Sequence, residues 1–83
     1  MFYGYILQSS NTYRYYAGHA EDLHNRVTEH NAGESKSTRE GIPWQLIHVQ
    51  EFNNRSDAMK GETKVKSRGI ERYLKDQQEK NSG

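Results

Sequence analysis

Residues 2–18 read FYGYILQSSNTYRYYAG, and this stretch decides the fold. Its first part, Phe2 to Leu7, is short, aromatic and aliphatic, which is typical of a β-strand. Residues 8–12 contain two serines and an asparagine, residue types that favour a turn. Tyr13 to Gly18 is aromatic again and predicts a second strand, so the two strands should form an antiparallel hairpin.

A helix is expected directly after the hairpin, from Ala20 to His30. Four of its residues recur at i, i+3, i+4 and i+7 and therefore share one helical face: Leu23, Arg26, Val27 and His30. Residues 31–33 read Asn-Ala-Gly and predict the end of this helix, because glycine tolerates the left-handed conformation that ends helices.

The second half of the chain predicts a third strand and two more helices. After a polar connection, Pro43 opens a strand from Trp44 to Phe52. Simple alternation places Trp44, Leu46, His48 and Phe52 on one side of this strand and Ile47 and Val49 on the other. Asn53-Asn54 offers a cap for a helix from about Arg55 to Lys66, with Ala58, Met59, Glu62 and Val65 on its apolar face.

Gly69 should interrupt the helical pattern before a last short helix that carries Ile70, Tyr73 and Leu74. We therefore expect one domain over residues 1–76 and a polar, flexible tail over residues 77–83. The element order is β-β-α-β-α-α. An α+β fold with a three-stranded, mainly antiparallel sheet flanked by helices would bury the apolar faces.

Composition narrows the class of protein. The chain has 83 residues, enough for one domain, with 31% hydrophobic residues and a mean hydropathy of -1.20, which excludes a membrane span. It has no cysteine, so a disulfide framework and a thiolate zinc site are excluded. The N-terminus does not resemble a secretory signal. These features predict a cytoplasmic protein.

The net charge is only +1, but basic residues cluster in the last third of the chain. Within residues 60–75 the cations are Lys60, Lys64, Lys66, Arg68, Arg72 and Lys75, opposed by Glu62 and Glu71. Such a cluster can bind phosphates. The alternative is an ordinary solvated helix surface.

Three polar residues occupy positions that the helical pattern assigns to apolar side chains: Arg26, His30 and Glu62. Burying an isolated charge is costly, so each should have a partner, an ion or a cleft. Structural alternatives exist for all three. Arg26 could extend its charged end to the surface, His30 could be a hydrogen-bonded residue at a helix end, and Glu62 could pair with Lys66 one turn on.

Several short motifs in order resemble one nuclease family. Tyr3-Gly4-Tyr5-Ile6-Leu7 and Tyr16-Ala17-Gly18 are similar to the GIY and YIG elements of the GIY-YIG nucleases. Asp22 to Arg26, Glu29-His30-Asn31, Thr38-Arg39, Pro43 and residues 51–66 resemble the rest of the domain. The match covers about residues 2–67, and the small stand-alone bacterial members are the most similar. Relatives include phage homing endonucleases and the incision subunit of bacterial nucleotide excision repair.

The resemblance implies a fold and a set of roles. The family fold is a three-stranded antiparallel sheet flanked by helices, as expected above. Catalytic roles are implied for Tyr5, Tyr16, Arg26 and His30, and Glu62 would hold a divalent metal, Mg²⁺ or Mn²⁺. The implied partner is nucleic acid, with DNA the expected substrate. The residues expected to bind its phosphates are Arg39, Lys60, Lys64, Lys66 and Arg68.

These residue types suit phosphodiester hydrolysis. Arg26 can bracket phosphate oxygens and keeps its charge. Nearby cations should lower the pKa of a tyrosine, so that Tyr16 would orient or activate water with support from Tyr5. Glu62 is expected to be the only side-chain metal ligand. This mechanism requires Glu62 to lie on the same side of the sheet as Tyr5, Tyr16 and Arg26.

Three functions follow as alternatives. The first is a metal-dependent DNA endonuclease, selective for branched or damaged structures and serving repair or recombination, with a protein partner to supply specificity. The second is a nucleic-acid-binding adaptor with little or no catalysis, favoured by the low net charge and by the lack of a match to the family's asparagine after the metal glutamate. The third is an interaction module in which Arg26 and Glu62 form a buried ion pair.

Overall fold

The structure is a computed structural model in which residues 1–82 are described. Its elements are β1 (Phe2–Ser9), β2 (Tyr15–Ala20), α1 (Leu23–Asn31), the 3₁₀ helix η1 (Lys36–Gly41), β3 (Trp44–Phe52), α2 (Arg55–Arg68) and α3 (Ile70–Ser82). Apart from η1, which lies in the expected polar connection, this is the predicted order.

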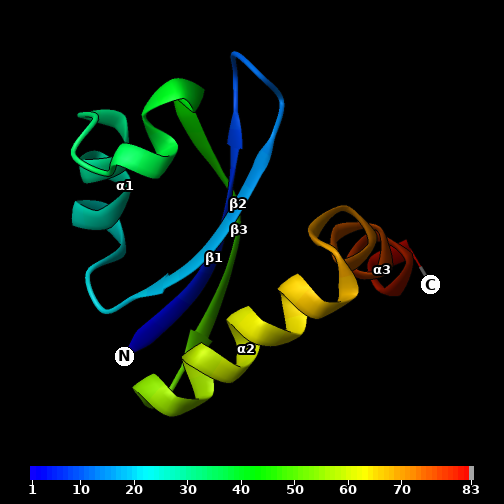
Figure 1. Cartoon of the computed structure of the whole chain (residues 1–83). Coiled ribbons are helices and arrows are strands. Elements are labelled where there is room, and N and C mark those ends of the chain that lie inside the picture. The colour runs from blue at the N-terminus through cyan, green and yellow to red at the C-terminus, as the bar shows by residue number, and fades with distance from the viewer. Residues whose placement is uncertain (83) are drawn as a thin grey trace.

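The three strands form one antiparallel sheet in the order β2-β1-β3. The sheet separates two helical layers, with α1 and η1 on one side and α2 and α3 on the other (Figure 1). The predicted α+β architecture is confirmed. Because β1 is central, β2 and β3 are both edge strands, and β2 lies nearest the viewer in Figure 1.

The hairpin turn is longer than the sequence predicts, so β2 begins at Tyr15 instead of Tyr13. The Oγ of Ser9 accepts hydrogen bonds from the backbone N–H groups of Asn11 (3.1 Å) and Thr12 (2.8 Å). Tyr13 then adopts a positive φ of 63° and lies outside the strand. The strand consequently extends two residues further, to Ala20.

Helix α1 begins at Leu23, three residues later than predicted, because Ala20 is taken by the sheet, where it pairs with Tyr3. Asp22 caps the helix, and its side chain accepts a hydrogen bond of 3.0 Å from the backbone N–H of Asn25. An acidic side chain there also suits the positive end of the helix dipole.

The bounds of β3 agree with the prediction, but its expected alternation is wrong. Leu46 pairs with Leu7 and His48 pairs with Ile6, and the irregularity between these pairs leaves Ile47 unpaired. A bulge adds one residue to a strand and reverses the faces beyond it. Leu46 and His48 therefore lie on opposite faces, with His48 toward α3, where its ring is 5.4 Å from that of Tyr73.

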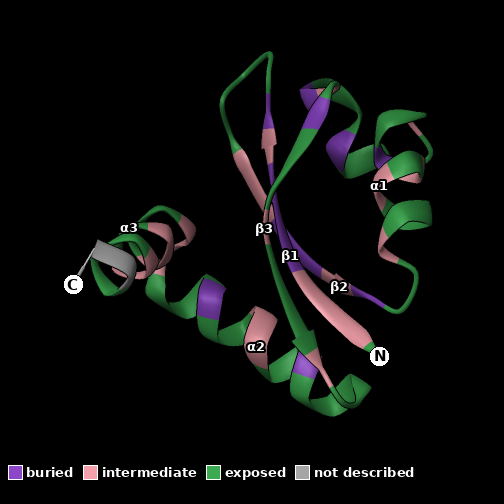
Figure 2. Ribbon diagram, turned by 180° about the vertical axis from the view of Figure 1, so that it is seen from behind, coloured by how far each residue is buried: buried purple, intermediate pink, exposed green. Residues whose placement is uncertain are grey.

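Apolar side chains fill both sides of the sheet, and the most buried positions follow β1 (Figure 2). On the α1 side the buried residues are Tyr5, Leu7, Ala20 and Trp44. On the α2 side they are Ile6, Ala17 and Val65, with Ile70, Tyr73 and Leu74 packed against them. Met59, predicted on the buried face of its helix, is 50% exposed.

The last two helices are longer than expected. Helix α2 continues two residues beyond Lys66 and ends at Gly69, whose φ of 93° favours glycine. Helix α3 continues to Ser82, so residues 77–82, predicted as a tail, are helical, as suits a sequence rich in Gln, Glu and Lys. Residue 83 lies outside the described part. None of the helices in residues 1–82 has the length and apolar character needed to cross a bilayer.

Candidate active site

Tyr5 lies in the middle of the central strand and is only 2% exposed. Its partner across the β1–β2 pair is Gly18. The phenol occupies the space that a side chain at Gly18 would fill, since a Cβ atom there would lie 2.7 Å from the Tyr5 Oη. The glycine of the second motif therefore lets the Tyr5 hydroxyl reach out over the edge strand.

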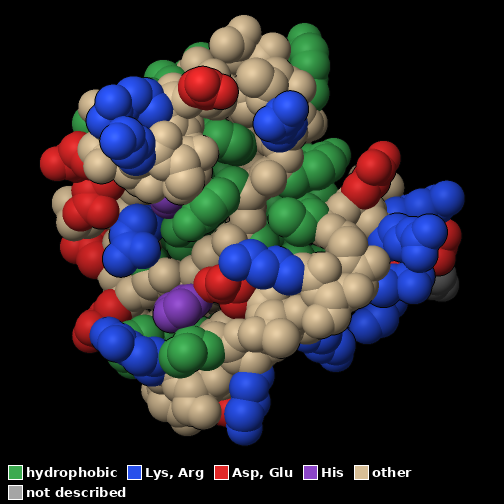
Figure 3. Space-filling model, viewed as in Figure 1, with side chains coloured by type: hydrophobic (Ala, Val, Ile, Leu, Met, Phe, Trp, Pro, Cys, Tyr) green, Lys and Arg blue, Asp and Glu red, His purple; other side chains and the backbone are tan. Residues whose placement is uncertain are grey.

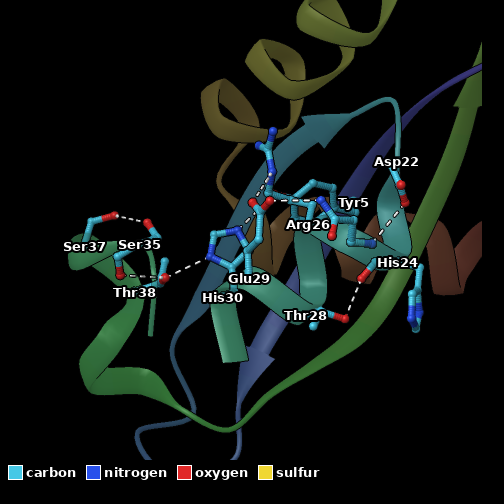
Figure 4. A network of polar contacts seen from close by, with 11 residues as sticks. Tyr5, Asp22, His24, Arg26, Thr28, Glu29, His30, Ser35, Ser37 and Thr38 are labelled. Atoms are coloured by element: carbon cyan, nitrogen blue, oxygen red, sulfur yellow. Dashed lines mark hydrogen bonds and ion pairs between the residues drawn. The ribbon is translucent and has the colours of Figure 1, made fainter. Parts of the chain in front are cut away.

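The Tyr5 hydroxyl begins a chain of buried hydrogen bonds (Figure 4). Tyr5 Oη lies 3.2 Å from His30 Nε2, and His30 Nδ1 lies 2.8 Å from Thr38 Oγ1. Thr38 Oγ1 donates to the Ser35 carbonyl, so it accepts from His30 Nδ1–H. Nε2 of a neutral His30 is then an acceptor, and Tyr5 donates its proton to it.

Thr38 belongs to η1, and hydrogen bonds and packing hold η1 against Trp44 at the start of β3. The Asn31 side chain accepts from Trp44 N (2.6 Å) and donates to Trp44 O (3.1 Å). The Trp44 indole Nε1–H donates to the Thr38 carbonyl at 2.7 Å. Gly41 is required for this packing, because a Cβ atom would lie 2.2 Å from the Trp44 ring. The buried tryptophan thereby fixes the residue that orients His30.

Tyr16 lies on the same face as Tyr5 and is half-buried. Its ring centroid is 4.9 Å from that of His30 and 6.4 Å from that of Tyr5. The two tyrosines and the histidine thus form one aromatic group between the sheet and α1, as their proposed joint role requires.

Arg26 lies one turn before His30 on α1, and its side chain is 46% exposed. Its Nε is 3.4 Å from Oε2 of Glu29, which in turn accepts a 2.9 Å hydrogen bond from Asn25. Arg26 therefore reaches water, but it also lies close enough to Tyr5 and His30 to lower the pKa of both. The alternative of a buried Arg26–Glu62 ion pair is wrong, because each residue has other partners.

Glu62 projects from α2, the helix on the opposite side of the sheet from α1. Its Oε1 lies 2.6 Å from His19 Nδ1, and its Oε2 accepts a 2.7 Å hydrogen bond from Lys66 Nζ. Burial alone would raise the pKa of the Glu62 carboxyl, but the hydrogen bonds from Lys66 and His19 outweigh it and lower that pKa. Glu62 is therefore ionised near neutral pH.

The expectation that all these groups share one side of the sheet is wrong, and the condition set from sequence was too strict, because side chains from both layers can converge at an edge strand such as β2. Tyr5, Tyr16, Arg26 and His30 lie on the α1 side, whereas Glu62 starts from the α2 side and ends beside His19 on β2. The two sets approach each other at the β2 edge, where Figure 3 shows histidine, acidic and basic side chains side by side. Tyr5 and Glu62 line the same small cavity, and the Glu62 charge is one of the causes that raise the pKa of Tyr5.

The protonation state of Tyr5 differs from the expectation that nearby cations would lower its pKa. Burial first, and then the neighbouring Tyr16, raise the pKa of Tyr5 to about 12, although Arg26 acts in the opposite direction. Burial also lowers the pKa of His30, and Arg26 lowers it further. Tyr5 is therefore a protonated donor and His30 a neutral acceptor, so Tyr5 is poorly suited to be the base.

The donor set at Glu62 fits a divalent cation. It offers an ionised carboxylate at the molecular surface, and Mg²⁺ or Mn²⁺ sites commonly combine one or two carboxylates with water and phosphate oxygens. Among residues 1–82, no group of three or more His, Cys, Asp or Glu side chains forms a closed metal cage. An open site of this kind leaves positions for a substrate.

The residues predicted to bind phosphates do not form one surface. Lys60, Lys64 and Arg68 recur every fourth residue on α2 and line a groove beside β3 and α3. Arg68 is bound to Asp76 there, at 2.8 Å and 3.1 Å. Lys66 lies on another face of α2, against Glu62. Arg39 is on the far layer, where its Nε donates to the Gly33 carbonyl.

Sequence reasoning missed His19 as a member of the site. It directly follows the second motif, and alternation along β2 places it on the face opposite to Tyr16 and Gly18. The same alternation could have shown that His19 faces the helix bearing Glu62. Recognising the contact also needed the register of α2 on the sheet, which the sequence does not supply.

Comparison with known proteins agrees with the fold described above. The family model of the GIY-YIG catalytic domain matches residues 1–82. A UPF0213 protein of Halobacterium salinarum is 39% identical over 67 residues, covering 80% of this chain and 86% of its own. A UPF0213 protein of Haloquadratum walsbyi is 44% identical over 66 residues, which cover 78% of this chain and 73% of the relative. A UPF0213 protein of Listeria innocua is 35% identical over 79 residues, which cover 90% of this chain and 87% of the relative. No solved structure matches the chain.

Proposed function

Because this chain belongs to the GIY-YIG catalytic domain family, a family of nucleases, we propose that it is a metal-dependent endonuclease that hydrolyses phosphodiester bonds in DNA. The observation that carries the proposal is that Tyr5, which is grouped with Tyr16 and His30, lines the same small cavity as Glu62 at the β2 edge. Cytoplasmic location and a role in repair or recombination remain predictions from sequence.

The reaction joins a water oxygen to phosphorus and breaks the bond from phosphorus to one ester oxygen. The water loses a proton, and the departing oxygen gains one. When bound, a divalent cation neutralises charge on the phosphate and on the departing oxygen. The ionised Glu62 carboxylate is the group that would hold it, with Mg²⁺ or Mn²⁺ the expected metals.

The side chains of α1 and the hairpin position the substrate. Arg26 has an exposed guanidinium that Glu29 holds in place, and it can bind two phosphate oxygens at once. Tyr16, half-buried beside His30, orients the attacking water. Tyr5 retains its proton and, with His30, fixes the position of the neighbouring groups, because a donor anchored in the core stays still while the substrate enters.

A cleavage assay tests this function. Labelled single-stranded, duplex and branched DNA would be incubated with the protein and Mg²⁺, Mn²⁺ or chelator. Glu62→Gln should abolish metal-dependent cutting, whereas Glu71→Gln, which alters an exposed carboxylate at the start of α3, should leave it intact. Cutting by Glu62→Gln at the wild-type rate would exclude the proposed role of this carboxylate.

One observation favours an adaptor without catalysis as the second candidate. Both oxygens of Glu62 already have partners, His19 and Lys66, so a cation must compete with them. An adaptor would bind DNA in a salt-sensitive manner without cutting it under any metal condition. The same DNA set, assayed by fluorescence anisotropy beside the cleavage assay, distinguishes the two.

A further inference from the structure

His19 contacts the carboxylate assigned to the metal, although no role is assigned to it by the family motifs found in the sequence. It lies on edge strand β2, on the face toward α2, and is 43 residues from Glu62 in the chain. Its side chain is 29% exposed and that of Glu62 is 20% exposed, so both ends of the contact are open to water and to a dissolved ion.

We propose that His19 Nδ1 and Glu62 Oε1 together form a two-ligand cation site, so that this chain favours transition-metal ions over Mg²⁺. The inference rests on the proposed function, because it concerns the cation of the same site. It also replaces the expectation that Glu62 is the only side-chain metal ligand.

The distance between His19 Nδ1 and Glu62 Oε1 is close to the separation of two neighbouring ligands on one cation. Two ligands at right angles on an octahedral cation, each about 2.1 Å from it, lie about 3 Å apart. His19 Nδ1 and Glu62 Oε1 are 2.6 Å apart, so a small rotation of either exposed side chain brings them to that separation. Without a cation, the same closeness is a hydrogen bond from the imidazole Nδ1–H to the carboxylate; a bound cation takes the place of that proton, which is then carried on Nε2 or released to solvent.

The chemistry of the two ligands carries the second step. A carboxylate suits Mg²⁺ and Mn²⁺ alike, but an imidazole nitrogen is a poor ligand for Mg²⁺ and a good one for transition metals. Affinity for nitrogen ligands rises from Mn²⁺ to Co²⁺ along the first transition row. A site with His19 should therefore discriminate between these ions in a graded way that a lone carboxylate does not.

Lys66 leaves room for this arrangement. Its ammonium binds the other carboxylate oxygen, Oε2, at 2.7 Å, and its side chain is 53% exposed. It can move into water when a cation arrives, and Oε1 remains directed at His19. The contact between His19 and Glu62 thus presents the metal with one oxygen and one nitrogen.

The competing explanation is that His19 only orients Glu62 by hydrogen bonding. His19→Asn separates the two, because an asparagine amide can donate from nearly the same place as Nδ1 but does not supply an imidazole nitrogen. His24→Asn is the matched control, since His24 is an exposed histidine on α1 with no assigned role. Glu62→Gln tests the carboxylate itself.

Calorimetric titration of the full chain with Mg²⁺, Mn²⁺ and Co²⁺, each alone and without DNA, provides the measurement. His19→Asn should weaken Co²⁺ binding by about tenfold or more, Mn²⁺ binding by less, and Mg²⁺ binding by no more than about twofold. His24→Asn should change none of them. If His19→Asn weakened the binding of all three ions equally, or weakened the binding of none of them, this inference would be overturned but the proposed function would stand.

Two further results keep the tests separate. Glu62→Gln should abolish binding of all three ions, and wild-type affinity in this variant would overturn the proposed function itself. Substoichiometric Mn²⁺ should broaden the imidazole NMR signals of His19 in the wild-type chain before those of His24 and His48. Broadening of other histidines with His19 unaffected would overturn the two-ligand site even if no His19 variant folds.

Discussion

Replacing Gly18 by alanine should displace the Tyr5 phenol and lower nuclease activity while the protein stays folded. A Cβ atom at residue 18 would lie 2.7 Å from Tyr5 Oη and 2.9 Å from Tyr5 Cζ. Ordinary contacts begin at 3.4 Å, so the hydroxyl must move by about 0.7 Å. The Tyr5–His30 bond of 3.2 Å is already long and would not survive that movement unchanged.

The size of the effect follows from the displacement. A misplacement of about 1 Å can cost about a hundredfold in rate, so we expect a loss of roughly tenfold to a hundredfold. Crowding a packed site costs about 1–3 kcal/mol, partly offset by about 0.5–1 kcal/mol because alanine restricts the unfolded chain more than glycine does. Folding should therefore remain measurable by urea denaturation.

Gly4→Ala is the matched control for this experiment. Gly4 lies on the neighbouring strand, and a Cβ atom there would meet the Phe52 ring at 3.0 Å, on the opposite face from Tyr5. Initial rates of metal-dependent cleavage should fall in Gly18→Ala and fall much less in Gly4→Ala, because Gly4 pairs with His19 but the atoms nearest an added Cβ all belong to Phe52. A folded Gly18→Ala protein with wild-type activity, or equal losses in both variants, would refute the reasoning about Tyr5.

Three further predictions concern a guanidinium, two imidazoles and a helix cap. The Arg26→Lys variant should fold normally but cleave DNA at least about tenfold more slowly, because a single ammonium replaces the paired N–H donors of the guanidinium. Steady-state cleavage rates on one labelled duplex measure this effect, and an unchanged rate would contradict it. Burial lowers the pKa of His30 and His48 below the unfolded value of about 6.5. As the pH falls through about 6.5, the unfolded chain takes up protons on these histidines before the folded chain does. The stability that neutral His30 and His48 give the folded protein is therefore fully present above about pH 6.5 and is lost progressively below it. Urea midpoints at about pH 7.5 and 5.5 should differ less in His48→Gln than in the wild type, and an equal difference counts against the assignment. Asn54→Ala removes the acceptor of a 2.8 Å bond from Asp57 N and should lower the unfolding free energy by about 1 kcal/mol without changing the cleavage rate, which urea denaturation and the cleavage assay would show.

Local patterns predicted the elements well where one physical signal dominated. The aromatic hairpin, the strand after Pro43 and the cap at Asn54 are examples, because each depends on neighbouring residues. The bulge at Ile47 was missed, since every residue from Leu46 to Val49 can occupy a strand and only the pairing with β1 decides which is skipped. The late start of β2 was missed because Ser9 extends the turn through its side chain.

The site was predicted in its parts but not in its arrangement. Helical spacing identified Arg26, His30 and Glu62 as polar residues on apolar faces, and the structure gives each a partner. Spacing within one helix could not show that Glu62 belongs to the opposite layer. Nor could it identify His19, because that contact depends on where a later helix lies on the edge strand.

Trp44 gives the protein a built-in optical probe. It is the one tryptophan in the chain, it is buried, and its ring lies 6.3 Å from that of Tyr16 in the α1 layer. Its fluorescence emission therefore reports water entering that layer and is insensitive to fraying of the C-terminal helices. A red shift that precedes the loss of far-ultraviolet ellipticity would place the first loosening at the tyrosines, before the chain as a whole unravels.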